Sequence, residues 1–119
     1  MALTSKNEHQ EQVALIQWFR LQHPKHTKCL WAIPNGGVRN IGTAIKLKRE
    51  GVVPGVSDLF LMIPNNTKHG LFLEMKAKSG KLTTEQKEFL FLAESMGYDA
   101  KVAYSYEEGK EIIKKYLQE

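Results

Sequence analysis

The fold of this chain is best indicated by residues 58–77, which read DLFLMIPNNTKHGLFLEMKA. Residues 58–63 are almost all apolar, which is typical of a strand buried on both faces of a sheet. Residues 64–70 are polar and turn-rich, and residues 71–77 are again mostly apolar. Two such runs joined by a short turn segment predict a β-hairpin.

The segments on either side of the hairpin predict alternating helices and strands. Helices are expected where an apolar stripe follows a capping residue, and strands where short β-prone runs lie between turn signals. Ser5 and Glu8 fit the Ser-x-x-Glu capping box of the first helix. The expected helices are 5–23, 43–50, 83–97 and 105–117, and the expected further strands are 28–33 and 99–104. This order predicts an α/β fold in which a mixed central β-sheet is flanked by helices.

The composition predicts a single globular domain over residues 1–119, with 42% hydrophobic and 25% charged residues. The one cysteine, Cys29, excludes an internal disulfide framework. No apolar run is long enough to span a membrane and the first residues do not resemble a signal peptide, so we expect a cytoplasmic protein. The net charge of +4 is compatible with a polyanionic partner but does not identify one. Trp18 and Trp31 lie in apolar patterns and are expected in the core rather than as platforms for stacked bases.

The second strand of the predicted hairpin carries two charged residues, Glu74 and Lys76, on one face. Charged groups in the middle of a sheet are costly unless they are paired or bind a metal. The first strand places Asp58 on the same face, in either of two registers. A turn centred near residue 67 puts Asp58 opposite Lys76, and a shift of two residues puts it opposite Glu74. In both registers two carboxylates lie close enough to converge on one cation.

Two carboxylates with few other protein ligands suit Mg²⁺, which keeps several waters and often binds substrate phosphate, and we expect Mn²⁺ to substitute for it. A metal there would activate a water molecule, and Lys76 would orient that water or stabilise the transition state. The competing interpretation is a cross-strand ion pair of Asp58 with Lys76 that has no catalytic role.

These residues resemble the signature of the PD-(D/E)xK nucleases, and the chain as a whole resembles their VRR-NUC branch, the virus-type replication and repair nucleases. The resemblance covers most of the chain. It is carried by Glu8 with Gln12, residues 33–39, 47–52, 55–58, 74–76, 82–86 and 97–98. One departure is Ser57, which stands where the signature has a proline that shapes the turn before the aspartate.

The resemblance implies roles for several side chains. Asp58, Glu74 and the main-chain carbonyl of Met75 would bind the metal, and Lys76 would act at the nucleophilic water. Glu8 would reach the metal directly or through water, although Glu11 lies one turn away and is an alternative. Gln86 would lie at the edge of the site. Glu8 and Gln86 each hold the fourth place of a capping box, which is a sufficient structural reason for either residue.

Two further segments are candidates for contact with DNA. The glycines of the Asn35, Gly36 and Gly37 turn would let main-chain N–H groups approach a phosphate, with Arg39 adding charge. The same turn can also be purely structural. A basic helix end formed by Lys46, Lys48 and Arg49 would contact the phosphate backbone, although such helix ends are usually solvated faces.

The resemblance implies a Mg²⁺-dependent DNA endonuclease of a bacterium or phage-infected cell that acts in replication, repair or recombination. Stand-alone members resemble Holliday-junction resolvases, so we expect branched or junction DNA as substrate and a homodimer that presents two sites. A nucleic-acid-binding module without activity and a structural protein with an ion-pair network are the competing hypotheses.

Overall fold

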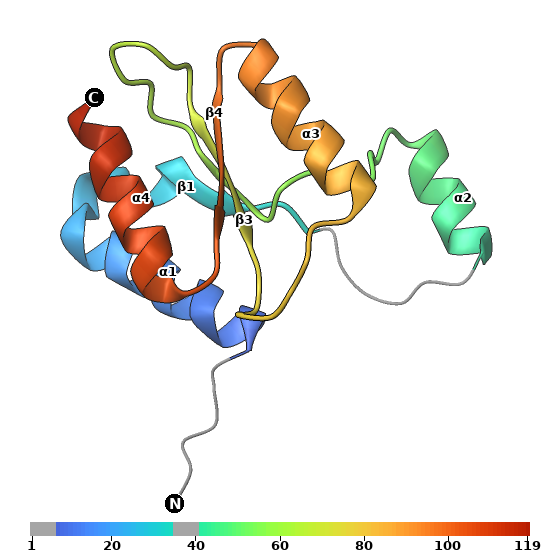
Figure 1. Cartoon of the computed structure of the whole chain (residues 1–119), viewed down its shortest axis with the longest axis horizontal. Coiled ribbons are helices and arrows are strands. Elements are labelled where there is room, and N and C mark those ends of the chain that lie inside the picture. The colour runs from blue at the N-terminus through green and yellow to red at the C-terminus, as the bar shows by residue number, and fades with distance from the viewer. Residues whose placement is uncertain (1–6, 35–40) are drawn as a thin grey trace, which may run out of the picture.

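The computed structural model describes residues 7–34 and 41–119. It confirms the predicted α/β fold, a mixed four-stranded sheet with flanking helices (Figure 1). The elements in chain order are α1 (Glu8–Gln22), the 3₁₀ helix η1 (Pro24–Cys29), β1 (Leu30–Ala32), α2 (Ile41–Arg49), β2 (Leu59–Leu61), β3 (Leu71–Met75), α3 (Thr84–Ser95), β4 (Asp99–Ala103) and α4 (Tyr106–Gln118).

The strands follow one another across the sheet in the order β1-β2-β3-β4. β1 pairs antiparallel with β2, and β2 pairs antiparallel with β3, which confirms the hairpin. β3 and β4 are parallel because α3 connects them in a βαβ crossover. The sheet is therefore mixed, as the order of predicted elements requires.

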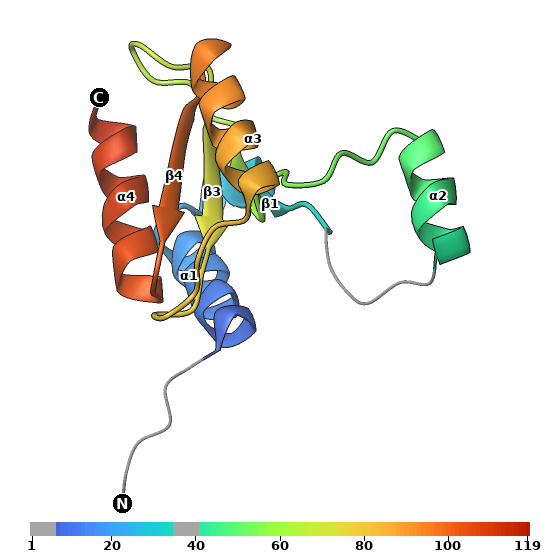
Figure 2. The same ribbon diagram turned by 45° about the vertical axis from the view of Figure 1, so that its right-hand side comes forward.

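The helices form layers on both faces of the sheet, as Figure 2 shows. α1 and α4 cover one face, where the apolar core lies. α3 packs on the other face, where Phe89 contacts Phe72 of β3 edge-to-face with ring centroids 5.0 Å apart. The core residues are Leu15 and Phe19 of α1, Ile113 and Tyr116 of α4, and Leu30, Leu59, Leu61, Leu71, Leu73, Met75 and Ala103 of the strands.

The hairpin adopts the second of the two predicted registers. Leu59 pairs with Leu73 and Leu61 with Leu71, so continuing the ladder by one residue puts Asp58 opposite Glu74. The loop between the strands is held by Asn65, whose side-chain oxygen accepts hydrogen bonds from the N–H groups of residues 67 and 68 at 2.9 and 2.7 Å. The Asn65 amide group in turn donates to the carbonyl of Tyr116 on α4 at 3.0 Å. The loop is thus fixed by α4 rather than by a tight turn.

Several predicted element boundaries are wrong by a few residues. The N-cap of α1 is Asn7, whose side chain pairs reciprocally with Gln10, and Ser5 lies outside the described residues. Asn-x-x-Gln satisfies the free N–H groups of a first turn as well as Ser-x-x-Glu does. The strand predicted over 28–33 is shorter because Pro24, placed in a first helical turn, opens η1 instead.

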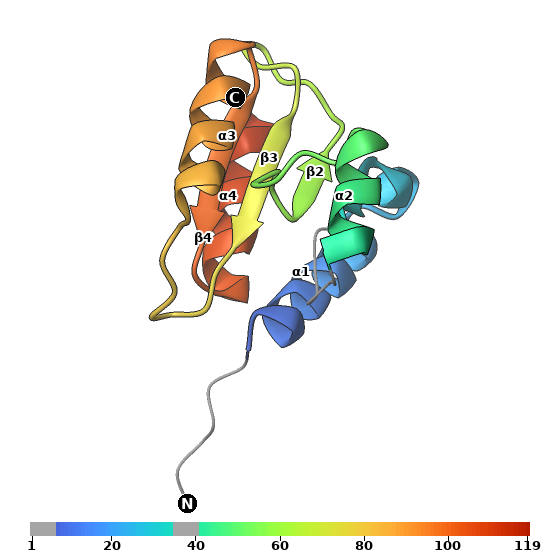
Figure 3. The same ribbon diagram turned by 90° about the vertical axis from the view of Figure 1, so that its right-hand side faces the viewer.

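The helix α2 stands apart from the sheet and from the helical layers in Figure 1, and in Figure 3 it projects toward the viewer. None of its residues is buried, and Ile41 and Ile45 are 80% and 55% exposed. A helix of this length is only marginally stable in water by itself.

Within residues 7–34 and 41–119, no helix has the length and apolar character needed to cross a membrane.

Gly55 joins the segment before β2 to the first turn of α3. Its φ is +88°, and a Cβ atom there would overlap the main-chain carbonyl of Glu85. Gly51, at the end of α2, has a similar φ of +99° but open space around it. An alanine at Gly51 would therefore add backbone strain alone, whereas an alanine at Gly55 would add backbone strain and a steric clash.

We expect Gly55→Ala to lower the free energy of unfolding by about 1–3 kcal/mol more than Gly51→Ala. Both variants acquire the strain of a left-handed residue, about 1–2 kcal/mol, but only Gly55→Ala displaces α3. Urea denaturation followed by circular dichroism measures the difference. Equal midpoints for the two variants would contradict the close contact between Gly55 and α3.

Candidate active site

The pairing of β2 with β3 brings the predicted acidic pair together. Asp58 directly precedes β2, Glu74 lies in β3, and Lys76 follows two residues later on the same face. Glu74 is 2% exposed, while Asp58 and Lys76 are partly buried. Leu73 and Met75 point to the opposite face and belong to the core, as the alternation of the strand predicts.

Asp58 is fixed by main-chain hydrogen bonds to both neighbouring strands. Its side-chain Oδ2 accepts a hydrogen bond from the Met75 N–H at 2.7 Å. Its main-chain carbonyl accepts one from the Ile33 N–H at 2.8 Å. The carboxylate is therefore held in place by the sheet itself. The residue before it, Ser57, is fully buried at the position of the signature proline.

Glu74 carries a buried carboxyl group that is only partly satisfied. Oε2 accepts a hydrogen bond from Gln86 Nε2 at 3.4 Å, and Oε1 has no hydrogen-bond partner among the described residues. The pKa of Glu74 is raised to about 9, mainly because burial disfavours the charged form, and also because its carboxyl shares a hydrogen bond with Asp58 and lies beside the Asp58 and Glu8 charges; the Lys76 charge lowers it. A free, buried carboxylate oxygen beside a second carboxylate is the donor set that a hard divalent cation prefers.

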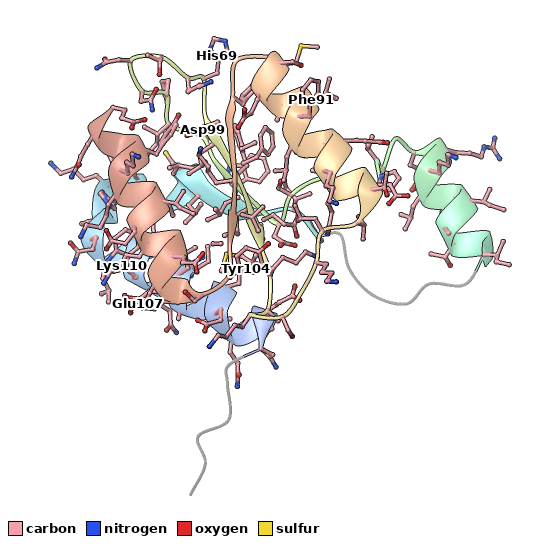
Figure 4. The ribbon with its side chains drawn as sticks, in the orientation of Figure 1. His69, Phe91, Asp99, Tyr104, Glu107 and Lys110 are labelled. Carbon is pink, nitrogen blue, oxygen red and sulfur yellow. The ribbon has the colours of Figure 1, made fainter. Side chains whose placement is uncertain are left out.

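Lys76 does not form the predicted alternative, a cross-strand ion pair. Within the described residues, no ion pair joins Lys76 to Asp58 or Glu74. In the described part of the chain, the three ion pairs are Lys101–Asp99, Lys110–Glu107 and Lys114–Glu111, on β4 and α4; Figure 4 labels Asp99, Glu107 and Lys110. The ammonium group of Lys76 is nevertheless close enough to lower the pKa of Glu74. Lys76 is thus a nearby positive charge that forms no ion pair with a carboxylate of residues 7–34 or 41–119.

The two glutamates of the first helix have different environments. Glu11 Oε2 accepts a hydrogen bond from the Tyr106 N–H at 2.9 Å and so caps the first turn of α4. Glu8 is the exposed first residue of α1, takes no part in the capping box, and acts electrostatically on Glu74. This arrangement favours Glu8 over Glu11 as the acidic residue that faces the site.

Among the described residues, no three His, Cys, Asp or Glu side chains gather closely enough to hold a metal. The structure therefore brings Asp58, Glu74 and Met75 together without Glu8 as a third carboxylate ligand. The role of Glu8 at the metal stays a prediction.

Gln86 caps α3 and also contacts Glu74, while its role in catalysis stays a prediction. Its Oε1 accepts a hydrogen bond from the Thr83 N–H at 2.9 Å, which completes the capping box of α3. Its Nε2 points to Glu74. One side chain thus joins the start of α3 to the acidic pair.

The candidate DNA-contacting residues are only partly described. Asn35, Gly36, Gly37 and Arg39 lie outside the described residues. Lys46, Lys48 and Arg49 are exposed in the last turn of α2.

Sequence patterns misplaced one aromatic residue. Trp18 packs against the core as predicted, but Trp31 is 43% exposed. The period-two alternation of β1 already points Trp31 away from the core face that contains Leu30, so this signal was available in the sequence.

Comparison with known families agrees with this geometry. Residues 6–107 match the family model of the VRR-NUC domain. The chain belongs to the VRR-NUC family. A solved structure of a VRR-NUC domain protein is 28% identical in sequence, with a TM-score of 0.86 over 98% of this chain and 92% of the other. No curated protein matches the chain at a significant level. The VRR-NUC domain has a nuclease-type fold, and the acidic pair lies where its predicted signature residues meet.

We expect Glu74→Gln to stabilise the metal-free protein. Between pH 4.5 and about 9 the folded state keeps a proton on Glu74 that the unfolded state loses, so the stability of the unmodified protein falls as pH rises. The advantage of the glutamine variant therefore grows with pH, by at most about 1.4 kcal/mol per pH unit.

Denaturation curves at several pH values, in the presence of a chelator, measure this difference. Glu94→Gln, an exposed change on α3, is the control and should show no such trend. A glutamine variant whose advantage is independent of pH would contradict the buried, protonated state of Glu74.

Proposed function

We propose that this VRR-NUC protein is a Mg²⁺-dependent endonuclease that hydrolyses DNA phosphodiester bonds, with Mn²⁺ able to replace Mg²⁺. The observation that carries the proposal is the free, buried Oε1 of Glu74 beside the Asp58 carboxylate. A buried carboxyl oxygen without a hydrogen-bond partner reduces stability, and a bound cation would satisfy it once the group has lost its proton.

The residues of the site fit a magnesium ion. Asp58 and Glu74 would bind it through carboxylate oxygens, and the Met75 carbonyl would add a main-chain ligand. A bound Mg²⁺ would lower the pKa of a water molecule and offset negative charge on the phosphate. Glu74 must give up its proton before it can serve as a ligand, because the pKa of about 9 keeps it protonated at neutral pH in the metal-free protein.

The other side chains would act on the substrate. Lys76 supplies a positive charge that can orient the attacking water or stabilise the charge that develops on the phosphate oxygens. Gln86 keeps Glu74 in place through its amide group and fixes α3 against the site. Asp58 needs no reorganisation, because the Met75 N–H already holds it.

We further propose that the substrate is branched DNA, and that the protein is a Holliday-junction resolvase-like homodimer in replication, repair or recombination. A four-way junction has approximate two-fold symmetry, and a two-fold dimer would present one site to each of two opposed strands. The basic end of α2 supports binding through phosphates, which reads the shape of DNA rather than its sequence.

Cleavage assays test the proposal. We expect the protein to cut four-way junctions in the presence of Mg²⁺ and to cut linear duplex of the same sequence at least 10-fold more slowly. Asp58→Ala and Lys76→Ala should each lower the rate by a factor of about 10² or more, because each removes a group that acts at the transition state. Lys78→Ala, an exposed change two residues from Lys76, is the matched control and should cut normally.

The site also predicts a response to the metal alone. Mg²⁺ should raise the melting temperature of the unmodified protein but not that of Asp58→Ala. Activity that persists equally in Asp58→Ala and Lys76→Ala would eliminate this site. Binding of junctions without cleavage under any divalent metal would instead indicate a binding module.

The basic end of α2 gives a separate prediction. Replacing Lys46, Lys48 and Arg49 together by alanine should weaken DNA binding and reduce the slope of log affinity against log salt by up to about 2.7, since each phosphate contact contributes about 0.9. The control replaces Lys101, Lys114 and Lys115 of β4 and α4, which removes the same charge elsewhere. An equal loss of slope in both variants would show that only net charge matters.

A further inference from the structure

Trp31 is an exposed tryptophan on the same face of the sheet as the acidic pair. Leu30 points into the core, so Trp31, the next residue of β1, points to the opposite face. It pairs across the strands with Phe60, and the two rings meet edge-to-face with centroids 5.4 Å apart. Phe60 lies two residues after Asp58 and therefore on the face that carries Asp58.

The position of Trp31 relative to the site follows from the register. The Ile33 N–H bonds to the Asp58 carbonyl, which continues the β1–β2 ladder and puts Ile33 opposite Asp58. Trp31 is thus the diagonal neighbour of Asp58, and such neighbours have Cβ atoms roughly 7–8 Å apart. That separation corresponds to about two base steps of 3.4 Å along a nucleic acid strand.

Trp31 forms the open end of an aromatic row. Phe60 contacts Phe72 with centroids 4.5 Å apart, and Phe72 contacts Phe89 of α3. The inner rings are only partly exposed, whereas Trp31 is 43% exposed and Met62, directly after β2, is 53% exposed. Contact with Phe60 holds the indole ring in place while leaving much of its surface free. A rigid, exposed aromatic surface of this kind is the usual platform for a stacked base.

We propose that Trp31 binds an unpaired nucleobase by stacking, one or two nucleotides from the phosphate that occupies the acidic pair. The position of that phosphate rests on the function proposed above. A base within a duplex is stacked on its neighbours and cannot present its face to Trp31 without being displaced. Trp31 therefore favours DNA that has unpaired nucleotides next to the cleavage site, such as splayed arms, flaps and junctions with an open centre.

The binding step can be tested without metal or cleavage. The chain has two tryptophans, so Trp18→Phe leaves Trp31 as the only indole fluorophore. We expect a labelled single-stranded oligothymidine to quench its fluorescence at the concentrations where anisotropy shows the oligonucleotide bound. The same strand in a duplex should quench it much less. Trp31→Phe, which keeps Trp18, is the matched control and should show little quenching.

Three results of this titration would overturn the proposal. In the first, the oligonucleotide binds but does not quench the fluorescence. In the second, duplex quenches as strongly as the single strand. In the third, the oligonucleotide does not bind at concentrations up to millimolar. Loss of a dimer in Trp31→Ala, seen by sedimentation together with absent quenching, would also overturn it and assign the face to a second copy of the chain. Quenching in a protein that cleaves no DNA would support base binding while contradicting the nuclease proposal.

Cleavage kinetics provide the second test. Stacking on one base is worth about 1–3 kcal/mol, so Trp31→Ala should raise KM for a splayed arm about 5- to 150-fold with a much smaller change in kcat. Trp31→Phe should recover part of the loss, since phenylalanine keeps an aromatic face. A fall in kcat with KM unchanged, or equal defects in the alanine and phenylalanine variants, would show that Trp31 only supports the fold around Asp58.

Discussion

The hydrogen bond from the Met75 N–H to Asp58 Oδ2 is the contact on which the site depends. It joins a side chain at the start of β2 to the main chain of β3, and it forms only when Asp58 lies opposite Glu74. Because successive side chains of a strand point to opposite faces, a slip of one residue would turn Glu74 and Lys76 into the apolar core. The same slip would bring Leu73 and Met75 to the polar face. The register is therefore fixed by burial on one face and by this hydrogen bond on the other.

The sequence predicts the kind of site better than its geometry. Local patterns are sufficient to predict the hairpin, the shared face of Asp58, Glu74 and Lys76, and the Thr83–Gln86 capping box. Each of these features depends only on the spacing of residues along the chain. They left two registers open. In the observed register, the loop between the strands is held by Asn65, whose side chain donates a hydrogen bond to the carbonyl of Tyr116, more than fifty residues away. No local pattern contains such a contact.

Other differences have equally specific causes. Glu8 and Glu11 are indistinguishable in sequence because they lie one turn apart, and they are separated only by the Tyr106 N–H that Glu11 binds. The apolar pattern of the sequence predicts Trp31 in the core because aromatic residues in strands are usually buried. It is exposed because α3 packs over β3 and β4, whereas β1 lies at the edge of the sheet. The predicted start of α1 was displaced because Asn7 competes with Ser5 as an equally good cap.

The connection between α2 and β2 limits how the protein can engage DNA. Six residues lie between Gly51 and Asp58, and the seven residue steps that join them reach at most about 25 Å when fully extended. At 3.4 Å per base pair, this tether places the near end of the basic helix within about seven base pairs of Asp58 along a bound duplex. For the proposed cleavage reaction, this loop therefore limits how far from the acidic pair the basic helix can bind DNA, and a longer loop would extend that limit without altering Asp58 or Glu74.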